Sequence, residues 1–442
     1  MFGTDGVRGT PGRYPLDAET VERLGAATIQ ELAVERPRLL VARDTRESGP
    51  TIEQQLARGV FAQQGSLVSV GVLPTPAAAW LASSADFDGA FVISASHNPF
   101  PDNGIKLLTG DGEKASPALE SRIADRVGDP SWAPDLSSGP PLETRDMIPD
   151  YEGFLKTILP SDTPGASTRI AIDCANGATS TVAPHLFREL GFDAVVCHAA
   201  PDGRNINDGC GSTHPESLAA VVRRQACRLG VAFDGDGDRV ILVDAAGTVV
   251  DGDAMLFICA SHFASTGRLP GDSIVATVMS NIGLEVSLRA VGVGMYRCPV
   301  GDRSVREAMD EHGVSLGGEQ SGHIIFSDRL PTGDGLATAL SVIQVMHETG
   351  RELADLRRGL TVYPQVLLNV TVQRKPDLAA EPKIMAATTE AERTLGDQGR
   401  VLVRYSGTEP ILRIMIEGPD DELIQRLAES IAHCVRQRLG RG

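Results

Sequence analysis

Residues 39–72 read LLVARDTRESGPTIEQQLARGVFAQQGSLVSVGV and contain the pattern that decides the fold. The apolar run over 39–44 predicts a buried strand, and the polar TRESGP predicts a turn. The amphipathic stretch over 51–65 predicts a helix that ends at a glycine, and the apolar run over 66–72 predicts a return strand. Strand, turn, helix, glycine and strand in this order are typical of a βαβ unit.

The same pattern occurs twice more along the chain. Residues 170–198 contain the strand IAID, the turn ANGATS, the helical TVAPHLFRELG and the strand DAVVCH. Residues 274–300 contain IVATV, a turn and helix within MSNIGLEVSLRAVG, and the return strand GMYRCPV. Three copies predict an α/β protein with three related α/β domains built on mixed sheets.

Polar segments separate these units. Residues 128–150 are rich in Pro, Ser and Gly and indicate a linker, and further breaks are expected at 245–253 and near 359–364. After the last break come the apolar stretches VLLNVTV and RVLVRYSGTEPILRIMIEG and a closing amphipathic helix, which predict a small C-terminal α+β domain. The predicted domains are 1–145, 146–248, 249–360 and 361–442.

Bulk composition excludes several classes of protein. The formal net charge of -17 disfavours nucleic acid and anionic membranes as partners. No apolar run approaches the roughly 18 residues of a membrane helix, and the start, MFGTDGVRGTPG, lacks the features of a secretory signal. The 7 cysteines are odd in number and form no C-x-x-C pair. We therefore expect a cytoplasmic protein with reduced thiols.

Each repeat is followed by a further strand that ends in an unusual loop. These loops are FVISASHNP (91–99), VAFDGDGDR (231–239) and VSLGGEQSGH (314–323). In open α/β sheets, ligands gather at the carboxyl ends of the strands. The three loops are therefore expected to contribute either to one cleft between domains or to three separate sites.

The second loop predicts a metal site. Asp234, Asp236 and Asp238 alternate with glycines, which let the backbone fold tightly enough for the carboxylates to converge. Three hard oxygen donors suit Mg²⁺, whereas three crowded aspartates in a mere polar turn would repel each other. An EF-hand does not fit, because its sixth position holds Arg239 and its twelfth holds Ala245.

Several residues are equipped to bind an anionic, hydroxyl-bearing substrate. Guanidiniums in Gly-rich turns suit phosphate, although an arginine taken alone is more often a surface residue or a salt-bridge partner. The arginines concerned are Arg8, Arg239, Arg303, Arg404 and Arg413. Between the last two, Ser406, Gly407 and Thr408 offer hydroxyls and backbone N–H groups to the same phosphate. In GGEQSGH, Glu319, Ser321 and His323 offer partners for sugar hydroxyls.

The serines of the first loop admit two interpretations. Ser94 or Ser96 could cap a helix, because serine and asparagine cap well, or one of them could be a nucleophile. A serine nucleophile beside three Mg²⁺-binding aspartates favours phosphoryl transfer.

SASHNP, FDGDGDR, GGEQSGH and RYSGTEP, in this order and over the whole chain, resemble the α-D-phosphohexomutase superfamily. The resemblance implies a heart-shaped, four-domain enzyme around a central cleft. Such an enzyme passes a phosphate from a serine to a sugar phosphate, lets the bisphosphate reorient, and takes the other phosphate back. GGEQSGH, TVMSNIGLE (277–285) and FGTDGVRG (2–9) are similar to the bacterial members that convert glucosamine 6-phosphate to glucosamine 1-phosphate for UDP-N-acetylglucosamine and the cell wall.

The resemblance also implies roles for individual residues. Ser96 would carry the phosphate and, with Asp234, Asp236 and Asp238, hold Mg²⁺. Glu319 and Ser321 match positions that contact sugar hydroxyls. The loop that grips the non-reacting phosphate is matched by Arg404, Ser406, Gly407, Thr408 and Arg413. Positions near the transferring group are matched by Arg8, His97, Lys106, Arg239 and His323, with Lys106 and His323 as the acid/base pair.

The expected ligands follow from the same resemblance. They are a sugar-phosphate substrate, Mg²⁺, and glucosamine or glucose 1,6-bisphosphate as activator, bound by a monomer or homodimer. Three alternatives remain: a mutase for glucose or mannose phosphates, a non-catalytic sugar-phosphate sensor, and a Mg²⁺-dependent phosphatase.

Overall fold

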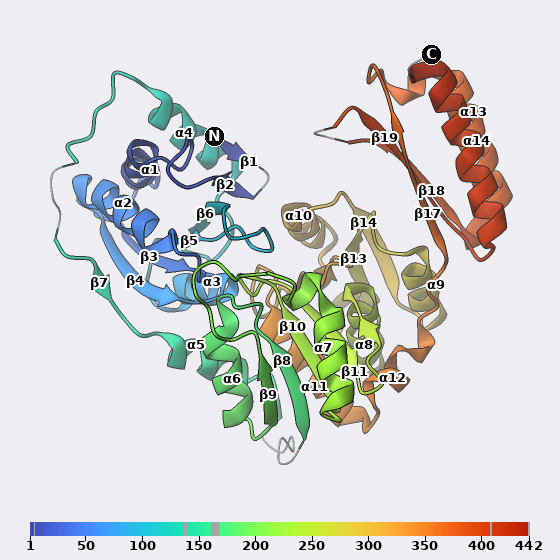
Figure 1. The fold of residues 1–442 in the computed structure, drawn as a ribbon, viewed down its shortest axis with the longest axis horizontal. Coiled ribbons are helices and arrows are strands. Elements are labelled where there is room, and N and C mark those ends of the chain that lie inside the picture. Colours follow the sequence, from blue (N-terminus) through green and yellow to red (C-terminus); the bar gives the residue numbers. More distant parts are fainter. Residues whose placement is uncertain (4, 137–139, 161–167, 407–408, 441–442) are drawn as a thin grey trace. The chain divides into compact units, whose positions relative to one another are not determined.

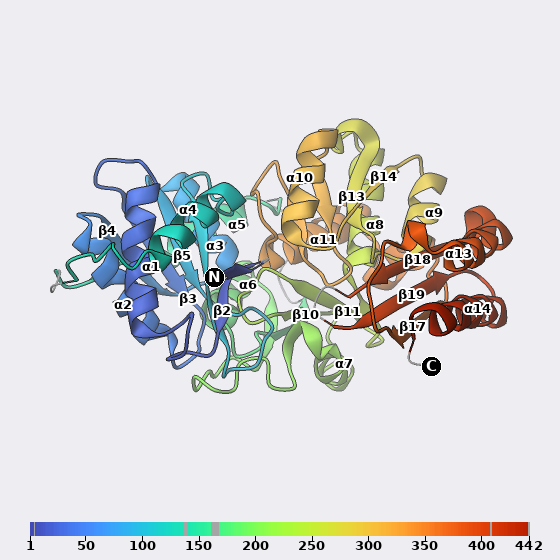
Figure 2. The same ribbon diagram turned by 90° about the horizontal axis from the view of Figure 1, so that it is seen from above.

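The computed structural model describes residues 1–440 apart from 4, 137–139, 161–167 and 407–408 (Figures 1 and 2). The chain divides into two compact units. The first comprises residues 1–279 and 295–357, and the second comprises residues 280–294 and 358–442. Each unit has its own sheets and its own hydrophobic core.

The first repeat lies in a seven-stranded sheet of order β1-β2-β6-β5-β3-β4-β7. Its strands are Phe2–Gly3, Gly6–Gly9, Asn103–Thr109, Gly89–Ile93, Arg38–Arg43, Ser66–Val72 and Glu143–Thr144. Strand β3 pairs in parallel with β4 and β5, whereas β5 pairs antiparallel with β6. The accompanying helices are α1 (Ala18–Glu31), α2 (Gly49–Ala62), α3 (Thr75–Ser84) and α4 (Pro117–Gly128).

The second repeat lies in a five-stranded sheet of order β12-β11-β10-β8-β9. Its strands are Val249–Val250, Val240–Asp244, Leu229–Phe233, Arg169–Asp173 and Asp193–Cys197. The accompanying helices are α5 (Ile148–Lys156), α6 (Thr179–Glu189) and α7 (Pro215–Arg224). Every residue of β10 is buried, as expected for a strand covered on both faces.

The third repeat lies in a four-stranded sheet of order β14-β13-β15-β16. Its strands are Gly294–Cys298, Ser273–Thr277, Leu316–Gly318 and Ile324–Phe326. The helices of this region are α8 (Gly252–Ser265), α10 (Asp302–His312), α11 (Gly335–Thr349) and α12 (Leu353–Leu356). Helix α9 (Ile282–Ala290), which follows β13 in the chain, belongs to the second compact unit.

The three predicted βαβ units are confirmed, and they share one further feature of topology. In each sheet a third strand pairs in parallel with the first strand of the unit and antiparallel with the strand that follows it. These third strands are β5, β10 and β15, and each of the three unusual loops begins at the carboxyl end of one of them.

The second compact unit contains a small antiparallel sheet of order β17-β19-β18. The strands are Gln365–Thr371, Ile411–Glu417 and Arg400–Tyr405, and the helices are α13 (Pro382–Leu395) and α14 (Asp421–Leu439). One apolar face of α14 packs on this sheet through Ile424, Ile431 and Val435, all fully buried. The predicted fold class, three mixed sheets followed by a small α+β domain, is confirmed.

Side chains at the helix starts explain where several helices begin. Asp17, Ser116, Asp334 and Asp420 each accept a hydrogen bond from a backbone N–H group in the first turn of the helix that follows. Such caps satisfy donors that the helix itself leaves unpaired.

Two predicted breaks are more ordered than expected. The linker over 128–150 contains β7, which pairs with β4, because Val68 and Ser69 leave an edge that an extended segment can join. The break over 245–253 contains β12, which pairs with β11. The domain boundaries themselves stay predictions.

Two further expectations concern membranes and thiols. Among the described residues, no helix combines the length and apolar character needed to cross a membrane. All 7 cysteines are free, and Cys174, Cys210, Cys227, Cys259 and Cys298 are buried.

Candidate active site

Ser96 lies three residues beyond the carboxyl end of β5, in a buried turn. It has a positive φ of 49°, which is uncommon for a residue other than glycine. The Ser94 hydroxyl accepts a hydrogen bond from the Ser96 N–H (2.9 Å) and donates one to Asp44 Oδ2 (2.6 Å). Ser94 therefore shapes the turn, and the helix-cap interpretation is wrong for both serines. The Ser96 hydroxyl donates to Asp234 Oδ2 at 2.6 Å.

The three aspartates that follow β10 converge as predicted. Asp234, Asp236 and Asp238 are buried, and their candidate ligand oxygens all lie within 4.8 Å of one another. Burial and the charges of Asp238 and Asp236 raise the pKa of Asp234 well above its usual range. Gly237, with φ of 73°, provides a conformation that the tight loop needs.

The donor set fits a divalent cation. Asp236 Oδ1 and Asp238 Oδ1 are buried, and neither forms a hydrogen bond with any residue that the structure describes. Buried carboxylate oxygens without partners are costly, and a hard cation would satisfy them. The Ser96 hydroxyl is hydrogen-bonded to the same cluster, at 2.6 Å from Asp234 Oδ2.

Lys106, on β6, points into the aspartate cluster. Its Nζ donates to Asp236 Oδ2 (2.9 Å) and Asp238 Oδ2 (3.5 Å), and Thr75 Oγ1 also donates to Asp236 Oδ2 (2.7 Å). Burial disfavours the charged lysine, but the surrounding carboxylates outweigh this effect and raise the pKa of Lys106. The side chain is therefore held as a cation.

His323 reaches the same oxygen of Asp238 from the third loop. Its Nδ1 lies 3.7 Å from Asp238 Oδ2, and its Nε2 accepts the Gly333 N–H at 3.2 Å. Burial opposes protonation of the imidazole, but the bond to Asp238 and its charge raise the pKa of His323. Two basic side chains thus share one carboxylate oxygen.

His97, Arg239 and Arg8 surround this centre. His97 Nδ1 lies 3.4 Å from Ser96 Oγ and 3.3 Å from Arg239 Nη1. Burial and the Arg239 charge lower the pKa of His97, so the ring is neutral at pH 7. Arg8 pairs with the carboxylate of Asp5, which also lies 3.4 Å from Lys106 Nζ.

The polar groups of the third loop bond to nearby backbone and to each other, and one of them, His323, lines a cavity. Glu319 Oε1 accepts the Gly301 N–H (3.0 Å), and the Ser321 hydroxyl donates to Glu319 Oε2 (3.4 Å). Arg303 and His323 line a cavity of about 200 Å³. Arg303 Nη2 donates to Glu120 Oε1 at 3.2 Å, so the guanidinium is paired with a carboxylate in this structure.

The remaining predicted residues lie in the second compact unit. Arg404 on β18 and Arg413 on β19 are directly opposite each other in the antiparallel ladder. Arg413 Nη2 donates to Glu409 Oε2 at 3.3 Å. The Ser406 hydroxyl accepts the Glu409 N–H at 3.2 Å. Gly407 and Thr408 lie outside the described residues.

Sequence reasoning missed several residues of the site. Asp5 lies inside the quoted FGTDGVRG motif, but its ion pairs with Arg8, Lys106 and Lys114 were not predicted. Thr75 and Asn207 carry no local signal, because they contact the site only across 161 and 111 residues of chain. Arg46 lies in the TRESGP segment, which was interpreted only as the turn between the strand and the helix of the first repeat.

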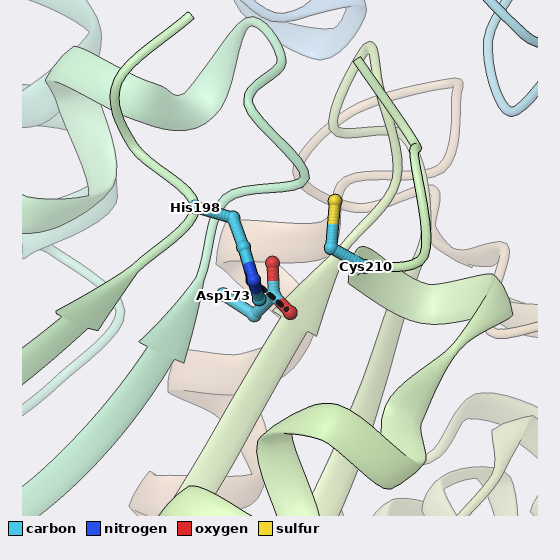
Figure 3. Close-up of side chains that lie close together, drawn as sticks. All are labelled: Asp173, His198 and Cys210. Atoms are coloured by element: carbon cyan, nitrogen blue, oxygen red, sulfur yellow. Dashed lines mark hydrogen bonds and ion pairs between the residues drawn. The ribbon is translucent and has the colours of Figure 1, made fainter. Parts of the chain in front are cut away.

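A second group of possible ligands lies at the carboxyl ends of β8 and β9 (Figure 3). Asp173, His198 and Cys210 lie close together there. However, Asp173 Oδ2 already accepts bonds from His198 Nδ1 (2.9 Å) and the Gly211 N–H (3.0 Å), and Oδ1 accepts the Ala175 N–H (2.9 Å). Burial raises the pKa of Cys210 to about 12, so this thiol is protonated at neutral pH. The carboxylate acts as an anchor for backbone N–H groups.

Comparison with known proteins agrees with this geometry. Successive segments match the phosphoglucomutase/phosphomannomutase family: alpha/beta/alpha domains I (1–133), II (151–247) and III (251–363), and the C-terminal domain (367–433). The chain therefore belongs to this family of phosphohexomutases, intramolecular phosphotransferases of the isomerase class.

Within the family, the similar full-length proteins have a narrower activity. The phosphoglucosamine mutase of Syntrophobacter fumaroxidans is 44% identical over 449 residues, covering 100% of this chain and 99% of its own.

Solved structures share the fold. A Burkholderia thailandensis phosphoglucomutase/phosphomannomutase family protein has a TM-score of 0.82 at 25% identity, covering 99% of this chain and 97% of its own. An Aspergillus fumigatus N-acetylphosphoglucosamine mutase, solved with GlcNAc-6P and magnesium, has a TM-score of 0.63 at 17% identity and covers 91% of this chain and 83% of its own.

Proposed function

We propose that this chain interconverts glucosamine 6-phosphate and glucosamine 1-phosphate through a phosphoserine at Ser96. The observation that carries the proposal is the 2.6 Å contact between the Ser96 hydroxyl and Asp234 Oδ2, inside a cluster of three buried aspartates. A hydroxyl in this position is the only serine oxygen bonded to the cluster among the described residues. The full-length relative at 44% identity supports the choice of substrate.

Asp234, Asp236 and Asp238 would hold Mg²⁺ together with an oxygen on Ser96. Carboxylate and phosphate oxygens are the donors that Mg²⁺ prefers, and a protein of the same fold was solved with magnesium. When bound, the ion offsets the negative charge of the phosphoryl group.

Transfer to the sugar forms a bond between phosphorus and a sugar hydroxyl oxygen and breaks the bond to Ser96 Oγ. The hydroxyl proton must leave, and the serine oxygen must gain a proton. Lys106 and His323 are the proposed acid/base pair, because both reach Asp238 Oδ2, at 3.5 and 3.7 Å. Lys106, held as a cation, donates to the serine oxygen, and His323 in its neutral form accepts from the sugar. The return transfer reverses these roles.

Other residues hold the substrate. Arg8, His97 and Arg239 bind the transferring phosphate, and Glu319, Ser321 and Arg303 bind the sugar. The phosphate that does not react is bound by Arg404, Ser406, Gly407, Thr408 and Arg413. Glucosamine or glucose 1,6-bisphosphate would prime Ser96. We place this monomer or homodimer in the cytoplasm, with domain boundaries near residues 145, 248 and 360.

Substitution of Ser96 tests the proposal most directly. We expect Ser96→Ala to fold normally but to show no turnover of glucosamine 6-phosphate, measured with catalytic bisphosphate in a coupled assay. Asp236→Asn should lose at least about 100-fold in kcat, because the cation loses a charged ligand. Ser83→Ala, on the exposed side of α3, is the control. A Ser96→Ala enzyme with normal turnover would refute the role of Ser96.

The substrate is tested by comparing glucosamine, glucose and mannose 6-phosphates under the same conditions. We expect the highest kcat/KM for the glucosamine compound. A preference for glucose or mannose would leave the reaction class unchanged and refute the narrower substrate. Net release of inorganic phosphate in place of the isomer would indicate a phosphatase.

A further inference from the structure

Arg46 is among the largest fully buried side chains of the molecule, although it belongs to no predicted site. It follows β3 in the first repeat and forms an ion pair with Asp44 at 2.9 Å. A buried guanidinium is costly unless all its donors are satisfied, so its surroundings indicate what it is for.

Each of the five N–H donors of Arg46 has a partner. Nε donates to Asp44 Oδ2 (2.9 Å). Nη1 donates to the carbonyl oxygens of Pro99 (2.5 Å) and Asp102 (2.9 Å). Nη2 donates to the carbonyl oxygens of Ser96 (3.0 Å) and Asn98 (2.8 Å). A guanidinium offers five donors in a fixed, planar arrangement, so these four carbonyls define the course of the loop that carries Ser96.

Asn207, from the loop before α7, binds two of the same carbonyls. Its Nδ2 donates to Ser96 O at 2.9 Å and to Asn98 O at 3.1 Å. The loop that carries the three aspartates also packs tightly against this carbonyl. A Cβ on Gly235 would lie 2.5 Å from Ser96 O, so a residue with a side chain would not fit there. Residues of the first two repeats thus meet at the backbone of the nucleophile.

The conformation of Ser96 explains why such support is needed. A serine with a positive φ of 49° lies in a sparsely populated region of backbone conformation, which persists only where neighbouring contacts enforce it. The Ser96 carbonyl receives hydrogen bonds from both Arg46 and Asn207. These bonds fix the peptide group next to the strained residue and so fix the direction of the Ser96 side chain.

We propose that Arg46, assisted by Asn207, is a positioning residue for phosphoryl transfer: it binds the carbonyl oxygens of residues 96, 98, 99 and 102 and so keeps Ser96 Oγ directed at the aspartate cluster. The proposal rests on the proposed role of Ser96 as phosphate carrier. We call the hydrogen bonds from Arg46 and Asn207 to these carbonyl oxygens the clamp. Because the sugar-binding residues lie on other loops, the clamp acts on the rate of transfer and leaves substrate affinity largely unchanged.

The test compares Arg46→Lys with Asn207→Ala. Lysine keeps the charge that neutralises Asp44 but cannot bind four carbonyls in one plane. We expect Arg46→Lys to fold, to lose about 100-fold in kcat, and to keep its KM for glucosamine 6-phosphate within about threefold of the parent value. Asn207→Ala removes only two bonds and should lose about 10-fold. The rate at which glucose 1,6-bisphosphate phosphorylates Ser96, followed by quench-flow and intact mass, should fall in the same proportion.

Two variants serve as matched controls. Arg43→Lys changes an arginine of the same segment that pairs with Glu53, and Asn205→Ala changes an asparagine of the same loop that bonds to residues 200 and 202. Both should keep kcat within about threefold. Folding is checked by circular dichroism and thermal melting, and kcat is expressed per folded molecule.

The outcomes separate the clamp from the role of Ser96. Full kcat in folded Arg46→Lys, or a loss no greater than the decrease in folded protein, overturns the clamp, because charge neutralisation of Asp44 then suffices. A rise in KM that accounts for the whole loss also overturns it. If Ser96→Ala retains turnover, the proposed function fails irrespective of the Arg46 result.

Discussion

The turns after β3 and after β8 each begin with a buried aspartate, but the two aspartates bind different partners. Asp44 directly follows β3, and Asp173 is the last residue of β8. Each accepts through Oδ1 the N–H two residues further on, at 3.0 and 2.9 Å. In the first repeat the residue at that position is Arg46, which binds the nucleophile loop. In the second it is Ala175, and Asp173 instead accepts bonds from His198 and from the backbone of Gly211 (Figure 3).

The difference shows how one repeated turn serves two purposes. Asp44 has a charged partner in a site without exposure to solvent, whereas the partners of Asp173 include two backbone N–H groups and an exposed imidazole. Yet the Gly211 N–H that Asp173 holds belongs to the loop that contains Asn207, and Asn207 contacts the Ser96 carbonyl. Both carboxylates are therefore linked to the Ser96 carbonyl, Asp44 through Arg46 and Asp173 through the loop that contains Asn207.

The largest expected difference is in stability. Asp44→Asn leaves the Arg46 guanidinium buried without a carboxylate, which should cost about 3–5 kcal/mol. Asp173→Asn disrupts the hydrogen bonds from the backbone N–H groups of Ala175 and Gly211 and should cost about 1–3 kcal/mol. Urea denaturation followed by circular dichroism measures both. An equal or smaller loss for Asp44→Asn would contradict the distinction between a carboxylate that pairs with a buried guanidinium and one that binds backbone N–H groups.

A smaller effect is expected on catalysis through Asp173. Asp173→Asn loosens the Gly211 N–H and hence the loop that carries Asn207, so kcat should fall, but by less than in Asn207→Ala. The KM for glucosamine 6-phosphate should not change. The measurement is steady-state turnover at a temperature where the variant is fully folded. A loss larger than that of Asn207→Ala would indicate that Asp173 acts by another route.

The smallest effect concerns Cys210, beside Asp173. Burial, and next the charge of Asp173, raise the pKa of this thiol from 9.0 to about 12. At pH 8 roughly one molecule in ten thousand carries the thiolate, so iodoacetamide should label Cys210 in urea but not in the native protein.

The same shift predicts a dependence of stability on pH. Because the folded protein retains the Cys210 proton to a higher pH than the unfolded chain does, the free energy of unfolding falls as the pH rises from 9 toward 12. The contribution lost by pH 10 is roughly 1 kcal/mol. Cys210→Ala should lack this part of the pH dependence. Identical pH profiles for the variant and the parent would contradict the raised pKa.

Much of the fold was predictable because its signals are local. The three βαβ units were legible in the alternation of apolar runs, turns and amphipathic stretches, and β3, α2 and β4 lie where residues 39–72 indicated. The three aspartates were also predictable, because their charges lie within five residues of one another and need a counter-ion. Strands β7 and β12 were not predicted, since they consist of two residues each and form only by joining an existing edge.

The sequence alone predicted the repeated units, the convergence of the three aspartates and, through the order of its motifs, the class of enzyme. Tertiary structure decided which side chains serve Ser96. Arg46 contacts the Ser96 carbonyl across 50 residues of chain, Asn207 across 111, and Ser96 itself contacts Asp234 across 138. No periodicity or spacing encodes such contacts, because they exist only once separate strands have brought their carboxyl ends together. In the sequence, Arg46 is only one residue of a polar turn, and its role becomes visible only when the carbonyl groups that it binds are in place.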